Sequence, residues 1–141
     1  MTDRRVIFSG AAWEPVVGYS RAVLVGSWVS VAGTTAAQPR GGAVGGNDPA
    51  EQTREAIRRI AAALEKVGAG LEHVVRTRMF VTDIRPASSV VQVSALIDPA
   101  LLVEVEADAD LLGGVTRRES TAPISTRYAI TGGAMSASTG P

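Results

Sequence analysis

Three acidic side chains alternate along the apolar run Leu101–Ala109: Glu104, Glu106 and Asp108. Successive side chains of a β-strand point to opposite faces, so this spacing places all three carboxylates on one face. Three neighbouring carboxylates repel one another in a dry environment, which favours a solvent-exposed face. The alternative is that one of them enters a cleft shared with another subunit, where burial would raise its pKa and let it act as an acid.

Two arginines, Arg76 and Arg78, share one face of a second alternating run, residues 74–82. A solvated strand face is the simplest interpretation. The alternatives are a contact between subunits or the rim of an anion-binding site, because a guanidinium can bind a carboxylate through two parallel hydrogen bonds.

Other site chemistries find little support in the sequence. The chain has no cysteine and a single histidine, His73, which excludes thiolate chemistry and argues against Cys- or His-based metal sites. Ser88 and Ser89 suggest a nucleophile, but His73 begins a separate strand, so a Ser–His hydrolase is disfavoured. The Gly-rich segment 35–47 lacks the spacing of a phosphate-binding loop. We therefore expect neither a metal ion nor a cofactor.

The composition describes a neutral chain with enough apolar residues for one core. Of its 141 residues 45% are hydrophobic, and 14 Lys plus Arg balance 14 Asp plus Glu. Zero net charge and 4% aromatic residues argue against nucleic-acid binding. No apolar run approaches the roughly 20 residues of a membrane span, and the N-terminus lacks the apolar stretch of a secretory signal. We expect a cytoplasmic protein that acts on neither nucleic acid nor membranes.

The strands that position these residues follow from apolar runs and turn residues. Runs on either side of Gly26-Ser27 predict a hairpin over residues 22–33, preceded by a short strand and a loop. Three further strands are predicted over residues 74–82, 89–96 and 101–109, the last two joined by the turn dipeptide Asp98-Pro99.

One amphipathic helix is predicted over residues 48–67. Asp48 is a good N-cap, Pro49 suits the first helical position, and Gly68 suits the position past the end. Spacings of three and four define an apolar stripe that would pack on the sheet: Ala56, Ile57, Ile60, Ala61, Leu64 and Val67.

These elements predict a single α+β domain over residues 1–109, with one helix covering one face of a sheet. Residues 110–141 change character and are rich in Gly, Ser and Thr. We expect them to form a C-terminal extension that is partly disordered, and its middle, ISTRYAIT, could add a strand or dock on a neighbouring subunit.

Three segments together resemble the Rid family of reactive-imine deaminases, also called YjgF-like proteins. They are GYSRAVLVGSWVSVAG, then DPAEQTREAIRRIAAALEKVGAGLEHVVRTRMFVTD, then RPASSVVQVSALIDPALLVEVEADA. The resemblance implies a chorismate-mutase-like fold in which three subunits pack their sheets into a central barrel, with clefts for small molecules between neighbours. A homotrimer agrees with the sheet face that a single helix leaves uncovered.

One element of the resembled family is missing from this sequence. Family members carry a second helix between the strand ending in Thr-Asp and the strand beginning Arg-Pro-Ala, but here Asp83 is followed directly by Ile84 and Arg85. So short a joint predicts a tight turn between antiparallel strands or a sharp bend in one strand, since parallel neighbours need a crossover of about a dozen residues. Three explanations stay open: a local change of topology, cover supplied by the C-terminal tail, or a natural segment that this chain lacks.

The resemblance also implies a reaction, the hydrolysis of imines and enamines to oxo acids and ammonia, with Glu104 and Tyr19 as catalytic residues. The backbone N–H groups of Gly33 and Thr34 would contact the substrate, while Ala32 replaces a family serine and removes one side-chain donor. The structural alternatives are an exposed strand residue for Glu104 and a packing residue with a satisfied hydroxyl for Tyr19.

Ser88 stands where the resembled family has the arginine of Pro-Ala-Arg-Ser, which binds the substrate carboxylate. Arg85 lies three residues earlier and could serve instead, although a solvated turn residue is the simpler interpretation. We place both in the expected substrate-binding region. Two functions stay open: a deaminase-like enzyme of a branch without the usual arginine, or a non-catalytic ligand-binding or assembly protein on the same scaffold. Loss of the bidentate contact predicts weak activity on ordinary amino-acid imines.

Overall fold

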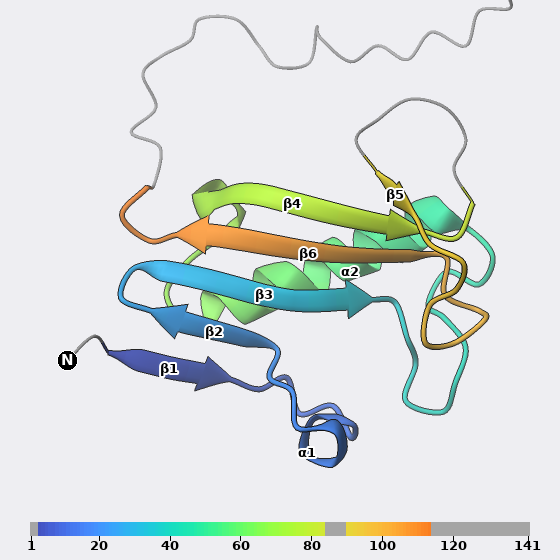
Figure 1. The fold of residues 1–141 in the computed structure, drawn as a ribbon, viewed down its shortest axis with the longest axis horizontal. Coiled ribbons are helices and arrows are strands. Elements are labelled where there is room, and N and C mark those ends of the chain that lie inside the picture. The colour runs from blue at the N-terminus through green and yellow to red at the C-terminus, as the bar shows by residue number, and fades with distance from the viewer. Residues whose placement is uncertain (1–2, 84–89, 114–141) are drawn as a thin grey trace, which may run out of the picture.

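The computed structural model describes residues 3–83 and 90–113 of the chain. A mixed six-stranded sheet carries one long helix on one face (Figure 1), and the predicted α+β class is confirmed. The elements are β1 (Arg4–Ile7), α1 (Glu14–Val17), β2 (Ala22–Val25), β3 (Trp28–Thr35), α2 (Pro49–Glu65), a 3-10 turn (Leu71–His73), β4 (Val74–Val81), β5 (Val91–Gln92) and β6 (Val103–Asp110).

The hairpin of β2 and β3 forms where the sequence predicts it. Val25 pairs with Trp28, so Gly26 and Ser27 are the two turn residues, and Gly26 has a φ of 60°. Positive φ at the first turn position matches the twist of antiparallel strands and costs glycine little.

Helix α2 begins with the predicted cap and ends at Glu65, two residues before the predicted end. The Asp48 carboxylate accepts hydrogen bonds from the backbone N–H groups of Ala50 and Glu51, and Gly68 beyond the helix has a φ of 80°. The buried stripe differs in part from the prediction, because Ile57 is 40% exposed whereas Gln52 is fully buried. The Gln52 side chain is satisfied by the backbone of Gly46, Ala100 and Leu102, so this polar residue ties the helix to the segment before β6.

The sheet order is β1-β2-β3-β6-β4-β5, which places β6 at the centre, antiparallel to both of its neighbours. Every second residue of β6 is buried against α2: Val103, Val105, Ala107 and Ala109. Burial of each larger apolar side chain contributes about 1.5–3 kcal/mol relative to leaving it exposed. The alternate residues, including the three acids, therefore lie on the face that looks away from α2.

The prediction for residues 89–96 is wrong in both length and direction. Strand β5 has only two residues and runs parallel to β4, with Phe80 opposite Val91. The apolar residues that follow do not alternate between two faces, since Leu96 packs with Leu101 in a small second cluster and Ile97 is 89% exposed. Residues 84–89 lie outside the described part, so the joint itself is not described, and the neighbouring residues Thr82, Asp83 and Val90 are not helical.

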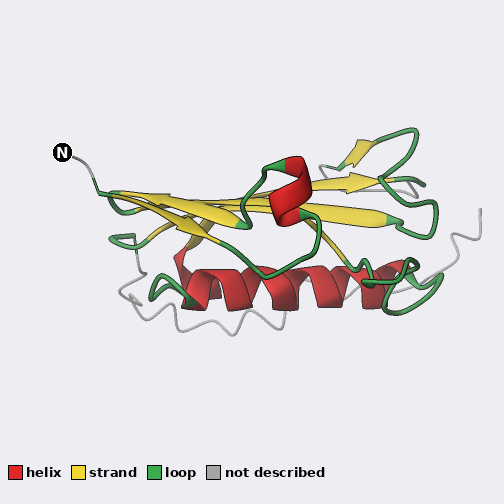
Figure 2. Cartoon of the chain, turned by 90° about the horizontal axis from the view of Figure 1, so that it is seen from below, coloured by secondary structure: helices red, strands yellow, loops and turns green. Residues whose placement is uncertain are grey.

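One face of the sheet has no covering layer among the described residues. Figure 2 shows α2 running along the other face, while the short helix α1 lies beside the sheet, past β1. The sequence predicts a loop rather than a helix at α1, so this element was missed. Only the first four residues of the C-terminal extension, 110–113, are described, and residue 110 ends β6. The predicted disorder and the possible extra strand lie outside the described residues.

Candidate functional site

Glu104 lies on the uncovered face of β6, opposite Thr35 of β3 and Phe80 of β4. Burial raises the pKa of its carboxyl, the neighbouring Glu106 raises it further, and the charge of Arg21 only partly offsets these effects. The carboxylate lies directly over Gly33, so closely that a methyl group at residue 33 would overlap it. The side chain of Glu104 makes no hydrogen bond among the described residues, which distinguishes it from the other acids of this strand.

Two other acids of β6, Glu106 and Asp108, are held by arginines. Asp108 accepts hydrogen bonds from Arg76 at 2.6 and 3.0 Å and from Ser30 at 3.0 Å, and Glu106 accepts one from Arg78 at 2.6 Å. Burial alone would raise the pKa of Asp108, but the bonds from Arg76 and Ser30 outweigh it and lower the pKa. Of the three alternating acids, Glu106 and Asp108 therefore form cross-strand ion pairs, and Glu104 alone has no bonded side-chain partner among the described residues.

Arg21 was not among the site residues predicted from the sequence, yet it contacts three of them. Its Nη1 donates to the carbonyl of Gly33 and to Oγ1 of Thr34, both at 2.9 Å, and its Cζ lies 5.6 Å from the centroid of the Tyr19 ring. The Thr34 hydroxyl in turn donates to the carbonyl of Ala32 at 2.8 Å. One guanidinium thus links Tyr19 to the irregular part of β3, where the register shifts between Val31 and Thr34.

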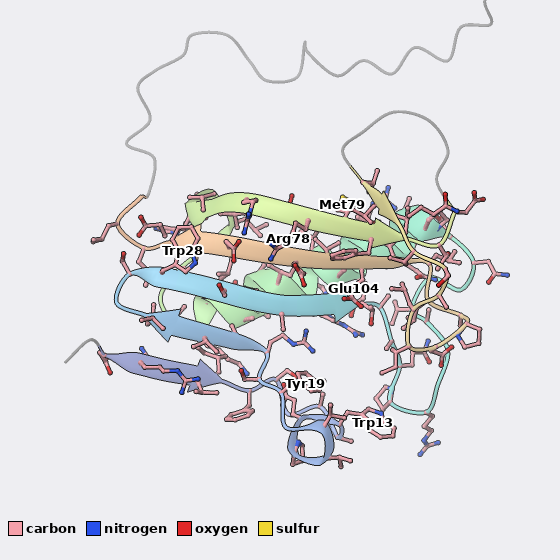
Figure 3. All side chains as sticks on the ribbon, in the orientation of Figure 1. Trp13, Tyr19, Trp28, Arg78, Met79 and Glu104 are labelled. Atoms are coloured by element: carbon pink, nitrogen blue, oxygen red, sulfur yellow. The ribbon has the colours of Figure 1, made fainter. Side chains whose placement is uncertain are left out.

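A groove with a volume of about 710 Å³ runs beside β1 and α1, and Tyr19 forms part of its wall. Its lining is mainly apolar, with Val6, Phe8 and Pro15, and includes the charged Arg4 and Glu14. In Figure 3, Tyr19 lies past β2 and Glu104 lies on the sheet near the end of β3. Glu104 itself does not line the groove, so Tyr19 is the predicted site residue that belongs to it.

A buried carboxylate fixes the loop at one wall of this groove. Glu14 is 3% exposed and accepts hydrogen bonds from N and Oγ of Ser9 and from N of Gly10, at 2.7–2.9 Å. Burial by itself raises the pKa of Glu14, but these bonds and the charge of Arg21 outweigh it and leave the pKa lowered. With its oxygens satisfied in this way, Glu14 is a structural residue.

The structure thus brings together four of the six predicted site residues: Tyr19, Gly33, Thr34 and Glu104. The remaining two, Arg85 and Ser88, lie outside the described residues. Within the described ranges, no group of three or more His, Asp or Glu side chains is arranged to hold a metal ion. None of the described helices combines the length and the apolar character needed to cross a membrane.

Comparison with known proteins places these observations in context. The family model described as "Endoribonuclease L-PSP" matches residues 9–85, which include Tyr19, Arg21 and Gly33 but not Glu104. A RutC family protein of Pyrococcus abyssi is 33% identical, over 74% of this chain and 94% of its own length.

Two solved structures are similar throughout their length. A Mycobacterium tuberculosis protein of the YjgF/YER057c/UK114 family is 48% identical with a TM-score of 0.65, over 77% of this chain and 99% of that one. A Rid-family protein of unknown function from Yersinia pestis is 29% identical with a TM-score of 0.63, over the same shares.

Proposed function

Because this chain belongs to the Rid family, also called the YjgF or L-PSP family, we propose that it binds small imines, enamines or oxo acids and hydrolyses reactive imines to oxo acids and ammonia. The observation that carries the proposal is the pair formed by Glu104, a half-buried carboxyl with a raised pKa, and Arg21 beside it. A carboxyl with a raised pKa keeps its proton closer to neutral pH and can donate it to a reacting group.

The proposed reaction needs a proton donor and a positioned water molecule. Protonated Glu104 donates its proton to the imine nitrogen while water adds to the carbon, and the carboxylate then takes the extra proton of the added water. Glu104 then protonates the nitrogen of the resulting carbinolamine, and the C–N bond breaks with its electron pair leaving on ammonia. An oxygen lone pair forms the C=O bond, and the Glu104 carboxylate takes the hydroxyl proton. Ammonia and the oxo acid leave, and the net reaction consumes one water molecule. Tyr19 is proposed to hydrogen-bond the ligand or the water with its phenol.

Three copies of the chain are proposed to assemble through the uncovered sheet face. Trp28, on this face opposite Asp110, is 45% exposed, and the strands around it have no described layer over them. An uncovered sheet of this size favours association, and closing three sheets on one another would shield it. Sedimentation velocity tests this: a trimer supports the proposal, and a monomer at micromolar concentration contradicts it.

Ammonia release tests the enzymatic proposal most directly. Imino acids are generated freshly by an amino-acid oxidase, and the rate of ammonia release is compared with and without the protein. We expect Glu104→Gln to reduce the acceleration by at least about 100-fold, since a positioned acid/base group typically contributes that much. The matched control is Asp108→Asn, whose carboxylate is bonded to Arg76 and Ser30 and which should stay within about twofold of wild type.

A second candidate function is a non-catalytic binding protein on the same scaffold. It is favoured by Ser88, which stands where the resembled family has its carboxylate-binding arginine. Binding of oxo acids without any acceleration of ammonia release would favour this candidate. The nuclease named in the description of the family model is less well supported here, because the chain has zero net charge and only 4% aromatic residues.

A further inference from the structure

We infer that Arg21 binds the carboxylate of the ligand, and therefore that the site takes small oxo or imino acids rather than neutral carbonyl compounds or imines. The inference rests on the proposed function and adds to it the residue that recognises the acid group. It concerns a residue that precedes β2 and is distant in sequence from Ser88 and Arg85.

The first argument is the use that Arg21 makes of its donors. A guanidinium has five N–H groups, and the two bonds to Gly33 and Thr34 both come from Nη1. The edge formed by Nε and Nη2 donates no hydrogen bond to any described residue. Such an edge matches the two oxygens of a carboxylate.

The second argument is the contrast with the other arginines of the central elements. Each arginine of α2 and β4 already bonds to a carboxylate: Arg54 with Glu51, Arg58 and Arg59 with Glu55, Arg76 with Asp108, and Arg78 with Glu106. Arg21 makes no such ion pair within the described residues, although Glu14 and Glu104 are close enough to feel its charge. Glu14 is occupied by Ser9 and Gly10, and Glu104 accepts no hydrogen bond from Arg21, although burial raises its pKa and the charge of Arg21 lowers it.

The third argument is that Arg21 is held in place before any ligand binds. The carbonyl of Gly33 and the hydroxyl of Thr34 fix one end of the guanidinium, and the Tyr19 ring lies against it. A side chain that is already ordered loses little further entropy on binding, which favours affinity for a small anion. Arg21 contacts the Tyr19 ring and bonds to Gly33, which lies under the Glu104 carboxylate, so a ligand held by Arg21 would lie near both proposed catalytic residues.

A purely structural role for Arg21 is the competing interpretation, since its bonds to Gly33 and Thr34 also brace β3. The experiment separates the two roles with a pair of probes, 2-oxobutanoate and its neutral amide, titrated by NMR against the full chain. The variants are Arg21→Gln and Arg21→Lys, the second of which keeps the charge but loses the planar guanidinium. Arg54→Gln, an exposed arginine on α2, is the matched control.

The inference predicts a selective loss of acid binding. Arg21→Gln should weaken 2-oxobutanoate about tenfold or more and leave the already weak amide unchanged, because charge-assisted hydrogen bonds are the strong ones. Arg54→Gln should stay within about threefold of wild type. If circular dichroism shows that Arg21→Gln does not fold, Arg21→Lys decides: it keeps the charge but lacks the planar edge, so acid binding should weaken several-fold while amide binding stays the same.

Three results would overturn the inference. Equal affinity of wild type and Arg21→Gln for 2-oxobutanoate would leave the proposed function standing and remove Arg21 from it. An equal loss of acid and amide binding, with a lower unfolding temperature, would assign Arg21 the structural role. Failure of the wild-type protein to bind 2-oxobutanoate at millimolar concentration would contradict the proposed function and this inference together.

Discussion

Glu104 and Asp108 lie on the same face of the same strand, yet their surroundings push their pKa values in opposite directions. Asp108 is more buried, but its oxygens accept hydrogen bonds from Arg76 and Ser30, and its pKa is lowered. Glu104 accepts none among the described residues, and its pKa is raised. Two carboxyl groups that share one face of a strand can therefore have pKa values shifted in opposite directions.

The difference comes from the strands on either side of β6. At the Asp108 end, β3 and β4 each supply a donor, Ser30 and Arg76. At the Glu104 end, β3 supplies Gly33, which has no side chain and leaves room for the carboxylate. At the first end the carboxylate is bonded across the sheet, and at the second end the carboxyl has no hydrogen-bond partner among the described residues, as the proposed role in proton transfer requires. Each of the following predictions tests one side of this comparison.

The largest expected effect comes from filling the space over Gly33. A methyl group in Gly33→Ala would overlap the Glu104 carboxylate and displace it, and a displacement of about 1 Å in a site can cost about 100-fold in rate. We expect that loss in ammonia release. Gly70→Ala is a matched control, because its methyl group would overlap the exposed carboxylate of Glu72, which can move into solvent. Similar activity of both variants would show that the position of Glu104 does not matter.

Removing the bonded acid should instead affect stability. Asp108→Asn weakens the contacts to Arg76 and Ser30, and we expect the free energy of unfolding to fall by about 1–2 kcal/mol in urea titrations. Ammonia release per folded molecule should stay within about twofold of wild type. A large loss of activity in Asp108→Asn would mean that the two ends of β6 are not functionally separate.

The contribution of Asp108 to the free energy of unfolding should also decrease as the pH falls. Its pKa is lower in the folded than in the unfolded state, so the stabilisation is complete above the unfolded-state pKa and is lost as pH falls through the folded-state value. The difference in unfolding free energy between wild type and Asp108→Asn should therefore shrink as pH falls from 7 toward about 2–3, near and below the ordinary Asp pKa. A difference that is constant over this range would contradict the lowered pKa.

The effect of Glu104 on the free energy of unfolding should have the opposite pH dependence and the smallest size. Its pKa is higher in the folded state, so the folded protein loses stability as pH rises from the unfolded-state value through the folded-state value. Glu104→Gln removes this loss and should stabilise the protein at pH 7 by about 0.5 kcal/mol, the usual size for a partly exposed residue. Destabilisation by this variant at pH 7 would indicate that Glu104 is a structural residue.

Parts of the fold that depend on neighbouring residues could be predicted from the sequence. Asp48 and Gly68 mark the ends of α2, and Gly26-Ser27 marks the β2–β3 turn, because caps and tight turns involve only a few adjacent residues. The partner and direction of β5 depend on contacts distant in sequence, and its apolar run fits a strand and an irregular segment equally well.

The candidate site also combines residues that could be predicted from the sequence with one that depends on contacts distant in sequence. Glu104 and Tyr19 were found through a family resemblance and not through spacing alone. Arg21 was missed because its role depends on Gly33 and Thr34, which the fold brings next to it across β2 and β3. The one available signal was a cation two residues after Tyr19, at the entrance of a strand. That pattern is too common to indicate a ligand without the structure.

The most direct test of the account is an NMR titration of the side-chain carboxyl groups of Glu104 and Asp108 in the same sample. The account predicts that Glu104 titrates above the ordinary Glu value of about 4.3 and Asp108 below the ordinary Asp value of about 3.9. In the Arg21→Gln variant the pKa of Glu104 should be higher still, because the positive charge that opposes the shift is removed. A Glu104 pKa at or below the ordinary value would contradict the claim that this carboxyl is set apart for proton transfer.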